Sequence, residues 1–129
     1  MRAIFLFIGL LPLILLGSAC SKIKGAPSVY VTNPIEHTHF DTGHTFQVAA
    51  SFTDNKGLAS YQVTVSDASG NALMEFGLDD SGSLSGKSHT YSASVNIPNG
   101  VEGTYYLHFI VIDDDGKKND KLHEFHVDN

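Results

Sequence analysis

The chain has 129 residues, with 8 basic against 14 acidic ones, and a formal net charge of −6 when histidines are neutral. This balance argues against nucleic-acid binding, which needs clustered Lys and Arg to neutralise phosphates. A single cysteine excludes a disulfide within the chain, and the length fits one domain with one hydrophobic core.

The first 19 residues have the pattern of a bacterial lipoprotein signal peptide. Arg2 precedes an apolar run over residues 4–16, and the small residues 17–19 lead into Cys20. The run of about 13 apolar residues is too short for a membrane-spanning helix, which takes roughly 20. We therefore expect cleavage after residue 19, a lipid on Cys20, and attachment to the outer membrane, on a face that the sequence leaves open. The alternative is a free cysteine after an ordinary secretory leader.

After a short lipidated tether over residues 20–27, the pattern changes to the period-two alternation of β-strands, which indicates one domain over residues 28–129. Turn-forming residues such as Asn55-Lys56-Gly57 and Asp115-Gly116 separate the segments. The predicted strands cover residues 29–32, 45–53, 59–66, 72–77, 88–97, 104–113 and 122–127. We expect an all-β fold of about seven strands.

The alternation also predicts which side chains face the core. The inward rows are Phe46, Val48, Ala50, Phe52; Tyr61, Val63, Val65; Tyr91, Ala93, Val95, Ile97; and Tyr105, Leu107, Phe109, Val111. The segment 104–113 is apolar on both faces, which is typical of a central strand. This arrangement favours a single immunoglobulin-like Greek-key β-sandwich.

Two stretches resemble a family of Ig-like domains of unknown function found in lipoproteins of Bacteroidota. One is residues 43–61 (GHTFQVAASFTDNKGLASY); the other comprises Ile97-Pro98, residues 103–105 (GTY) and residues 111–116 (VIDDDG). The resemblance implies the Ig-like fold, lipid anchoring and that lineage. It implies no activity, and the histidine-bearing segment that the family often carries after its third strand has no histidine here, in residues 65–70.

Histidines are the strongest candidates for a binding site, because the chain has seven of them. In an Ig-like topology the loop after the first strand, the start of segment 104–113 and the end of the last strand share one pole. We therefore predict a Cu or Zn site from His37, His39, His44, His108 and His126. Glu36, Asp41 and Glu124 are candidate carboxylate ligands or hydrogen-bond partners of the rings, and His89 is excluded because it lies at the other pole.

The inclusion of His108 depends on a predicted hairpin register. If the residue numbers of each pair in the last two strands sum to 234, Ile112 faces Leu122 and His108 faces His126. The alternative interpretation is that these are solvated loop and edge histidines with no metal.

Two other binding chemistries have weaker signals. Asp113, Asp114 and Asp115 should lie near Asp54 and Asn55, where oxygen ligands suit Ca²⁺, although Asp before Gly is ordinary turn chemistry. A glycan site would need an exposed aromatic platform, for which the candidates are Tyr30, Phe40, Phe76 and Tyr106.

The sequence holds no motif of an enzyme active site that we can identify. We therefore expect a non-enzymatic binding or accessory module on the bacterial envelope, held by its lipid, with an outer-membrane receptor or another envelope protein as its candidate partner. The alternatives are a protein- or glycan-interaction module without metal and, more remotely, a hydrolase.

Overall fold

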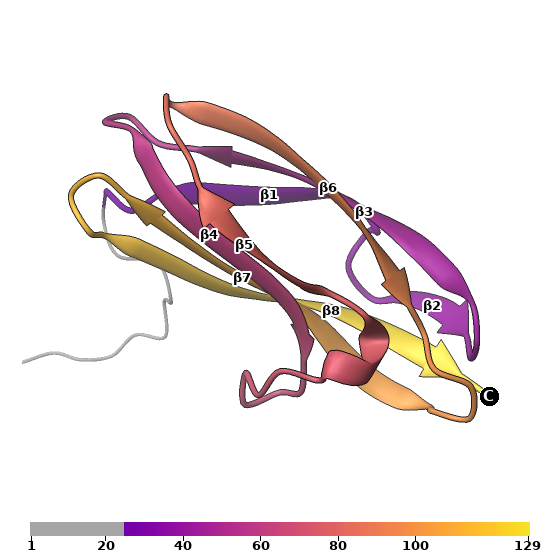
Figure 1. Ribbon diagram of the computed structural model, residues 1–129. Helices are drawn as coiled ribbons and strands as arrows, with labels where there is room; N and C mark the ends of the chain where they lie inside the picture. The colour runs from indigo at the N-terminus through magenta and orange to yellow at the C-terminus, as the bar shows by residue number, and fades with distance from the viewer. Residues whose placement is uncertain (1–24) are drawn as a thin grey trace, which may run out of the picture.

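The computed structural model describes residues 25–129, so the leader and Cys20 lie outside the described part. The described chain forms a sandwich of a three-stranded sheet (β1-β3-β6) and a five-stranded sheet (β2-β8-β7-β4-β5), shown in Figure 1. The strands are β1 (Ser28–Asn33), β2 (Thr38–Asp41), β3 (Thr45–Thr53), β4 (Leu58–Ser66), β5 (Asp79–Ser83), β6 (Ser88–Asn96), β7 (Gly103–Asp113) and β8 (Lys118–Asp128). The predicted all-β, Ig-like sandwich is confirmed, with eight strands.

The core lies between the sheets, where the predicted inward rows meet. Its largest members with no exposed surface include Phe52, Phe109 and Phe125. The ring of Phe109 meets that of Phe52 edge-on, with centroids 6.1 Å apart. Of the predicted inward residues, Tyr61, Ala93 and Tyr105 are only partly buried. No disulfide is needed to explain the fold, because apolar packing accounts for its interior.

The predicted strand over residues 72–77 is wrong. Met74–Phe76 form a short 3₁₀ helix, η1, and the strand follows it as β5. Leu73 and Phe76 point inward together because they are three residues apart, the period of a 3₁₀ turn, and Gly77 ends the turn with φ at +76°. Phe76 is fully buried, so it cannot serve as an exposed sugar platform.

Two features at the β8 edge differ from the expectation. Strand β2, which was not predicted, pairs in parallel with the end of β8, placing His39 beside His126. Strand β8 also begins at Lys118 and not at residue 122, and its pairs with β7 sum to 230, as in His108 with Leu122. The predicted register of 234 is therefore wrong by four residues. The polar segment 118–121 has the composition of a loop, so the sequence pattern predicts a start four residues too late.

The strands run between two poles of the sandwich. The β7–β8 turn and the start of β1 lie at the left end of Figure 1, whereas β2 and the C-terminus lie at the right end. Within residues 25–129 no helix is long and apolar enough to cross a membrane.

Candidate metal centre

The loop between β1 and β2 presents His37 to β8. A turn closes with a hydrogen bond from Thr38 N to Ile35 O of 3.1 Å, and His37 N donates to Glu124 O over 2.8 Å. His37 has φ of +70° and is the one non-glycine residue with positive φ in the described chain. This conformation is disfavoured for residues with a Cβ, although histidine adopts it more readily than most. The backbone is thus held in an unusual state that directs the imidazole at Glu124.

A buried histidine holds the same loop from beneath. The Nε2 atom of His123 lies 2.7 Å from the carbonyl oxygen of Pro34 and donates to it. Because His123 is buried on the inner side of β8, whereas Glu124 and His126 lie on the outer side, one strand supports the loop and supplies the site. This role of His123 was not predicted, although its position out of phase with Glu124 and His126 is a signal that it points inward.

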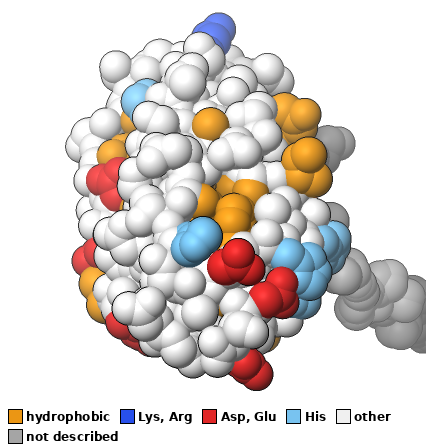
Figure 2. All heavy atoms as spheres, turned by 90° about the vertical axis from the view of Figure 1, so that its right-hand side faces the viewer, with side chains coloured by type: hydrophobic (Ala, Val, Ile, Leu, Met, Phe, Trp, Pro, Cys, Tyr) orange, Lys and Arg blue, Asp and Glu red, His pale blue; other side chains and the backbone are white. Residues whose placement is uncertain are grey.

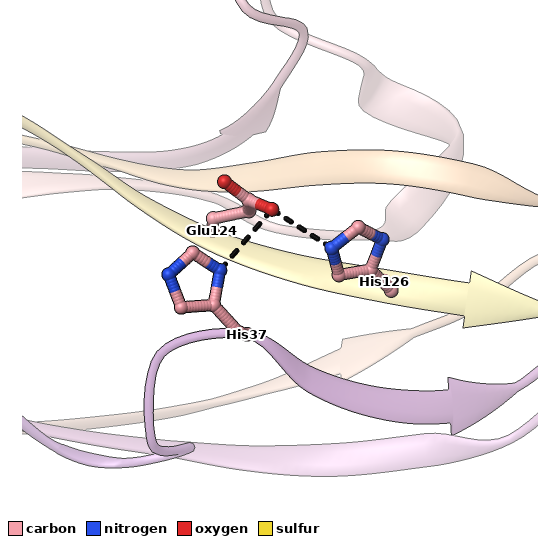
Figure 3. A group of neighbouring side chains, drawn as sticks. All are labelled: His37, Glu124 and His126. Atoms are coloured by element: carbon pink, nitrogen blue, oxygen red, sulfur yellow. Dashed lines mark ion pairs between the residues drawn. The ribbon is translucent and has the colours of Figure 1, made fainter.

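Three side chains converge on one point at this pole, as Figure 3 shows: His37 from the loop, and Glu124 and His126 from β8. Glu124 Oε2 lies 3.2 Å from His37 Nδ1 and 2.8 Å from His126 Nε2. The three ligand atoms all lie within 4.8 Å of one another. The Glu124 and His126 side chains are mostly covered, at 24% and 29% exposure, whereas that of His37 is 65% exposed. The site is a shallow, open chelate.

The carboxylate of Glu124 responds to this environment. Burial raises its pKa, but hydrogen bonds from His37 and His126 together outweigh burial and hold the pKa of Glu124 below its ordinary value. Glu124 therefore stays ionised to more acidic pH than a free carboxylate. An ionised carboxylate between two imidazoles is a donor set that suits a divalent cation.

Further contacts orient His126. Its Nδ1 lies 3.1 Å from the hydroxyl oxygen of Thr104, which is the residue of β7 that pairs with His126. While Nε2–H donates to Glu124, a neutral ring accepts from this hydroxyl at Nδ1. In the other tautomer Nδ1–H donates to the same hydroxyl and Nε2 is free to bind a metal, which is the usual role of such an outer partner. The ring of His39 stacks on that of His126 with centroids 4.8 Å apart, and His39 Nδ1 lies 3.0 Å from Asp128 Oδ2. Figure 2, which faces this pole, shows histidines beside acidic side chains.

The geometry of the three ligand atoms fits a small divalent ion after modest movement. Bonds of about 2.0–2.2 Å in a tetrahedral site put neighbouring ligand atoms roughly 3.3 Å apart. The distance from Glu124 Oε2 to His37 Nδ1, 3.2 Å, already matches that value, and the one to His126 Nε2, 2.8 Å, has to open slightly. The two imidazole nitrogens lie no more than 4.8 Å apart, and the exposed His37 ring can rotate inward. An open fourth position remains for water or another ligand.

The structure brings together only part of the predicted histidine set. His37 and His126 contribute to the cluster, and His39 stacks against it. His44 lies in the β2–β3 turn, outside the cluster. His108 pairs with Leu122, and its Nε2 lies 2.6 Å from Asp120 Oδ1. The predicted pairing of His108 with His126 is wrong, because the observed register places His108 opposite Leu122, four residues nearer the start of β8.

The acidic residues of the opposite pole are used by their own turns. One carboxylate oxygen of Asp113 accepts hydrogen bonds from Asp115 N and Lys117 N, and Asp54 Oδ2 accepts from Lys56 N and Gly57 N. Asp115 also pairs with Lys56 over 3.4 Å. Among the described residues these carboxylates belong to no group that could hold a metal ion. Turn stabilisation explains them, as their position before glycine suggested.

Residues 18–128 match a family defined by its domain of unknown function, DUF4625. The chain belongs to this family. No curated protein matches this DUF4625 chain. The match spans all the strands and the whole candidate metal centre.

Solved structures show the same fold at low sequence identity. The fibronectin(III)-like modules of CbhA from Clostridium thermocellum align with a TM-score of 0.53 and 14% identity, over 78% of this DUF4625 chain and 94% of the other. The periplasmic chaperone SfaE aligns with a TM-score of 0.52 and 14% identity, over 78% of this chain and 57% of its own. At these identities the likeness is one of fold alone.

Proposed function

We propose that this DUF4625 domain is a non-enzymatic binding module for a divalent transition metal, Zn(II) or Cu(II). The convergence of His37, Glu124 and His126 on one point supports the proposal. Two imidazoles and a carboxylate suit these metals, and the cluster contains no thiolate or thioether that would select Cu(I). The open fourth position and the exposed His37 ring favour a metal that exchanges with a partner over one that is locked in place.

The metal has no part in holding this domain together. The core consists of fully buried residues from both sheets, and the candidate centre lies outside that core, on the outer side of β8. We therefore expect metal binding to raise the melting midpoint only by mass action. This behaviour differs from that of structural zinc sites, where removal of the metal unfolds the domain.

Isothermal titration of Zn(II) and Cu(II) into the chain from Ser21 onward tests the proposal. We expect one saturable site, weakened at least about tenfold by His126→Ala, with a smaller loss for Thr104→Val, since the Thr104 hydroxyl orients His126 and does not bind the metal itself. His37→Gly is the sharpest variant, because it removes a ligand and glycine accepts the positive φ of this position. Affinity should fall in acidic buffer as protons compete for the imidazoles.

The matched controls are His89→Ala and His108→Ala, which remove imidazoles from outside the cluster. Both should bind metal like the unmodified protein. Absence of stoichiometric uptake would overturn the proposal, as would equal losses in the controls and in His126→Ala.

We further propose that the domain is carried on the outer membrane of a bacterium of the Bacteroidota, through a lipid on Cys20. The support is the sequence of the leader and its small residues before Cys20. In this setting the partner that delivers or removes the metal is an envelope protein or an outer-membrane receptor.

A protein- or glycan-interaction module without metal is the second candidate. Tyr30 and Ile35 are 68% and 76% exposed, and they line a depression of about 300 Å³ together with Glu36 and Lys121. An exposed tyrosine beside polar groups is a suitable surface for stacking a sugar ring or packing a peptide side chain. Of the other predicted platform residues, Phe76 is buried, and Phe40 stacks on Phe46. Binding to glycans or envelope proteins that survives metal removal and is lost in Tyr30→Ala would favour this candidate.

A further inference from the structure

The described lysines gather at the pole opposite the candidate metal centre. Four of the five lysines in residues 25–129 lie in or beside three turns there, and we name this region the lysine pole: Lys56, Lys87, Lys117 and Lys118. Hydrogen bonds join the turns, from Asp54 N to Lys87 O over 2.9 Å and from Asp114 N to Gly57 O over 3.0 Å. The lysine pole is therefore one continuous surface.

The described chain also begins at this pole. Gly25 and Ala26 line a depression with Asn55 and Lys87, and the Lys117 ammonium lies next to Gly25. Cys20 is five residues before Gly25. Five residues span at most about 17 Å even when fully extended, so a lipid on Cys20 keeps the lysine pole close to the bilayer.

Charge divides the molecule along the same axis. At the lysine pole the four lysines are balanced by four aspartates, at positions 54 and 113–115. Residues 25–129 carry 5 basic and 14 acidic side chains, so their net charge of 5 − 14 = −9 falls on the rest of the domain. Lys22 and Lys24 add two positive charges between Cys20 and the pole. Anionic headgroups repel the acidic remainder, whereas the lysine pole has no net charge and the two lysines before it are attracted.

We propose that the lysine pole rests on the lipid headgroups and that the domain stands upright, with the His37–Glu124–His126 centre facing away from the membrane. This inference rests on the proposed lipid anchor. Strand β8 runs from Lys118 at the lysine pole to His126 at the site, and eight residues of strand rise about 27 Å. A partner for the metal therefore approaches from the aqueous side. A protein embedded in the same bilayer reaches the site only if one of its domains extends as far from the membrane as the site does.

Fluorescence quenching in vesicles tests this orientation. The mature lipidated protein is reconstituted in phosphatidylethanolamine and phosphatidylglycerol containing a lipid with a nitroxide on its headgroup. Because the chain has one cysteine and the lipid blocks it, an introduced cysteine is the only free thiol for a fluorophore. Lys87→Cys reports on the lysine pole, and Asn99→Cys, in the exposed β6–β7 turn, reports on the other pole. Asn55→Cys replaces Lys87→Cys if that variant does not fold.

We expect the label at residue 87 to lose most of its fluorescence and the label at residue 99 to keep nearly all of it. Equal quenching would mean that the domain lies on its side, and stronger quenching at residue 99 would mean that it is inverted; either result overturns the proposed orientation. Flotation with the vesicles tests the anchor separately. Protein that carries no lipid and does not float would overturn the anchor and, with it, the orientation, whereas quenching results in floating protein concern the orientation alone.

Discussion

At the scale of single residues, the candidate centre depends on side chains whose direction is set by several independent contacts. His37 is held by its own backbone bond to Glu124 O, and His126 by the hydroxyl of Thr104. Glu124 lies between the two rings. Such preorganisation reduces the ordering needed when a metal binds. The burial and contacts of single side chains also determine which substitutions destabilise the fold.

Phe109→Ala should destabilise the domain by about 3–5 kcal/mol, because it removes a large buried side chain and leaves a cavity. Phe109 has no exposed surface and contacts Phe52 and Tyr91 edge-on. Urea denaturation measures the change in the free energy of unfolding. The control is Ile110→Ala, on the half-buried outer face of the same strand, which should lose clearly less. Equal losses would contradict the assignment of the faces of β7.

The Tyr91 hydroxyl should make the fold sensitive to alkaline pH. Burial first, and then the hydrogen bond to Asp80, raise the pKa of Tyr91 above its ordinary value of 10.0. A raised pKa means that the folded state holds this proton more tightly than the unfolded state. The stabilisation is therefore complete below about pH 10 and is lost as the pH rises above that value.

The measurement is the free energy of unfolding on either side of that pH. It should fall more steeply with alkaline pH in the unmodified protein than in Tyr91→Phe. Tyr30→Phe, which changes a tyrosine that is 68% exposed, is the matched control and should keep the steep dependence. If Tyr91→Phe leaves the slope unchanged, the hydroxyl has no such role.

At the scale of elements, strand β2 links the packing of the sandwich to the candidate centre. Its Phe40 is half-buried and stacks on Phe46 of β3, with ring centroids 4.0 Å apart. His39, on the opposite side of the strand, stacks on His126. The four-residue strand thus packs against the core with one face and against the site with the other. A substitution that loosens the packing of β2 should therefore affect both the stability of the core and the candidate centre.

Phe40→Ala should destabilise the domain by about 2 kcal/mol, less than the 3–5 kcal/mol of a fully buried phenylalanine. It should also weaken metal binding, because β2 follows the loop that presents His37. Phe52→Ala, at the far end of β3, should lower stability further and leave the metal affinity of the folded protein unchanged. Calorimetric titration of both variants under folding conditions separates the effects. Equal affinities in the two variants would show that β2 does not support the site.

At the scale of the whole molecule, the two poles have different roles in the proposed arrangement. The described chain begins at the lysine pole, and the histidine-bearing pole lies at the opposite end of the sandwich. Between them lies a core that needs no disulfide, which is consistent with a single cysteine reserved for lipid. The sandwich then serves as a spacer that holds the candidate centre away from the membrane.

Cys20→Ala should release the protein from the membrane fraction, because the lipid has no other thiol to occupy. One acyl chain binds membranes only marginally, so stable attachment requires the further chains of a mature lipoprotein. Fractionation of cells, with detection of the protein in membrane and soluble fractions, measures the change. Ser21→Ala is the control and should stay with the membrane. An unchanged distribution of Cys20→Ala would contradict lipid anchoring at this residue.

Much of the fold could be predicted because alternation acts locally. The inward row of β7, from Tyr105 to Val111, is visible in the sequence and faces the core as expected. Strand β2 could not be found in this way, because it has only four residues, with one histidine and one aspartate, and resembles a loop. Its parallel pairing depends on β8, which is more than 80 residues away in the sequence. The segment 72–77 could not be assigned correctly from the sequence, because a short apolar run fits either a strand or a tight helical turn.

The candidate site shows most clearly what only the tertiary structure decided. By itself, the sequence determined which side chains share a face, and it correctly put His108 and His126 on the outer face of the sheet. The numbers of paired residues of β7 and β8 sum to 234 in the predicted register and to 230 in the observed one. Because these sums differ by an even number, every residue stays on the same face of the sheet and only its cross-strand partner changes. The β7–β8 turn makes that choice, as the Asp113 carboxylate accepts hydrogen bonds from Asp115 N and Lys117 N and β8 begins at Lys118. His108 therefore meets Asp120, and His126 is left to join His37 and Glu124.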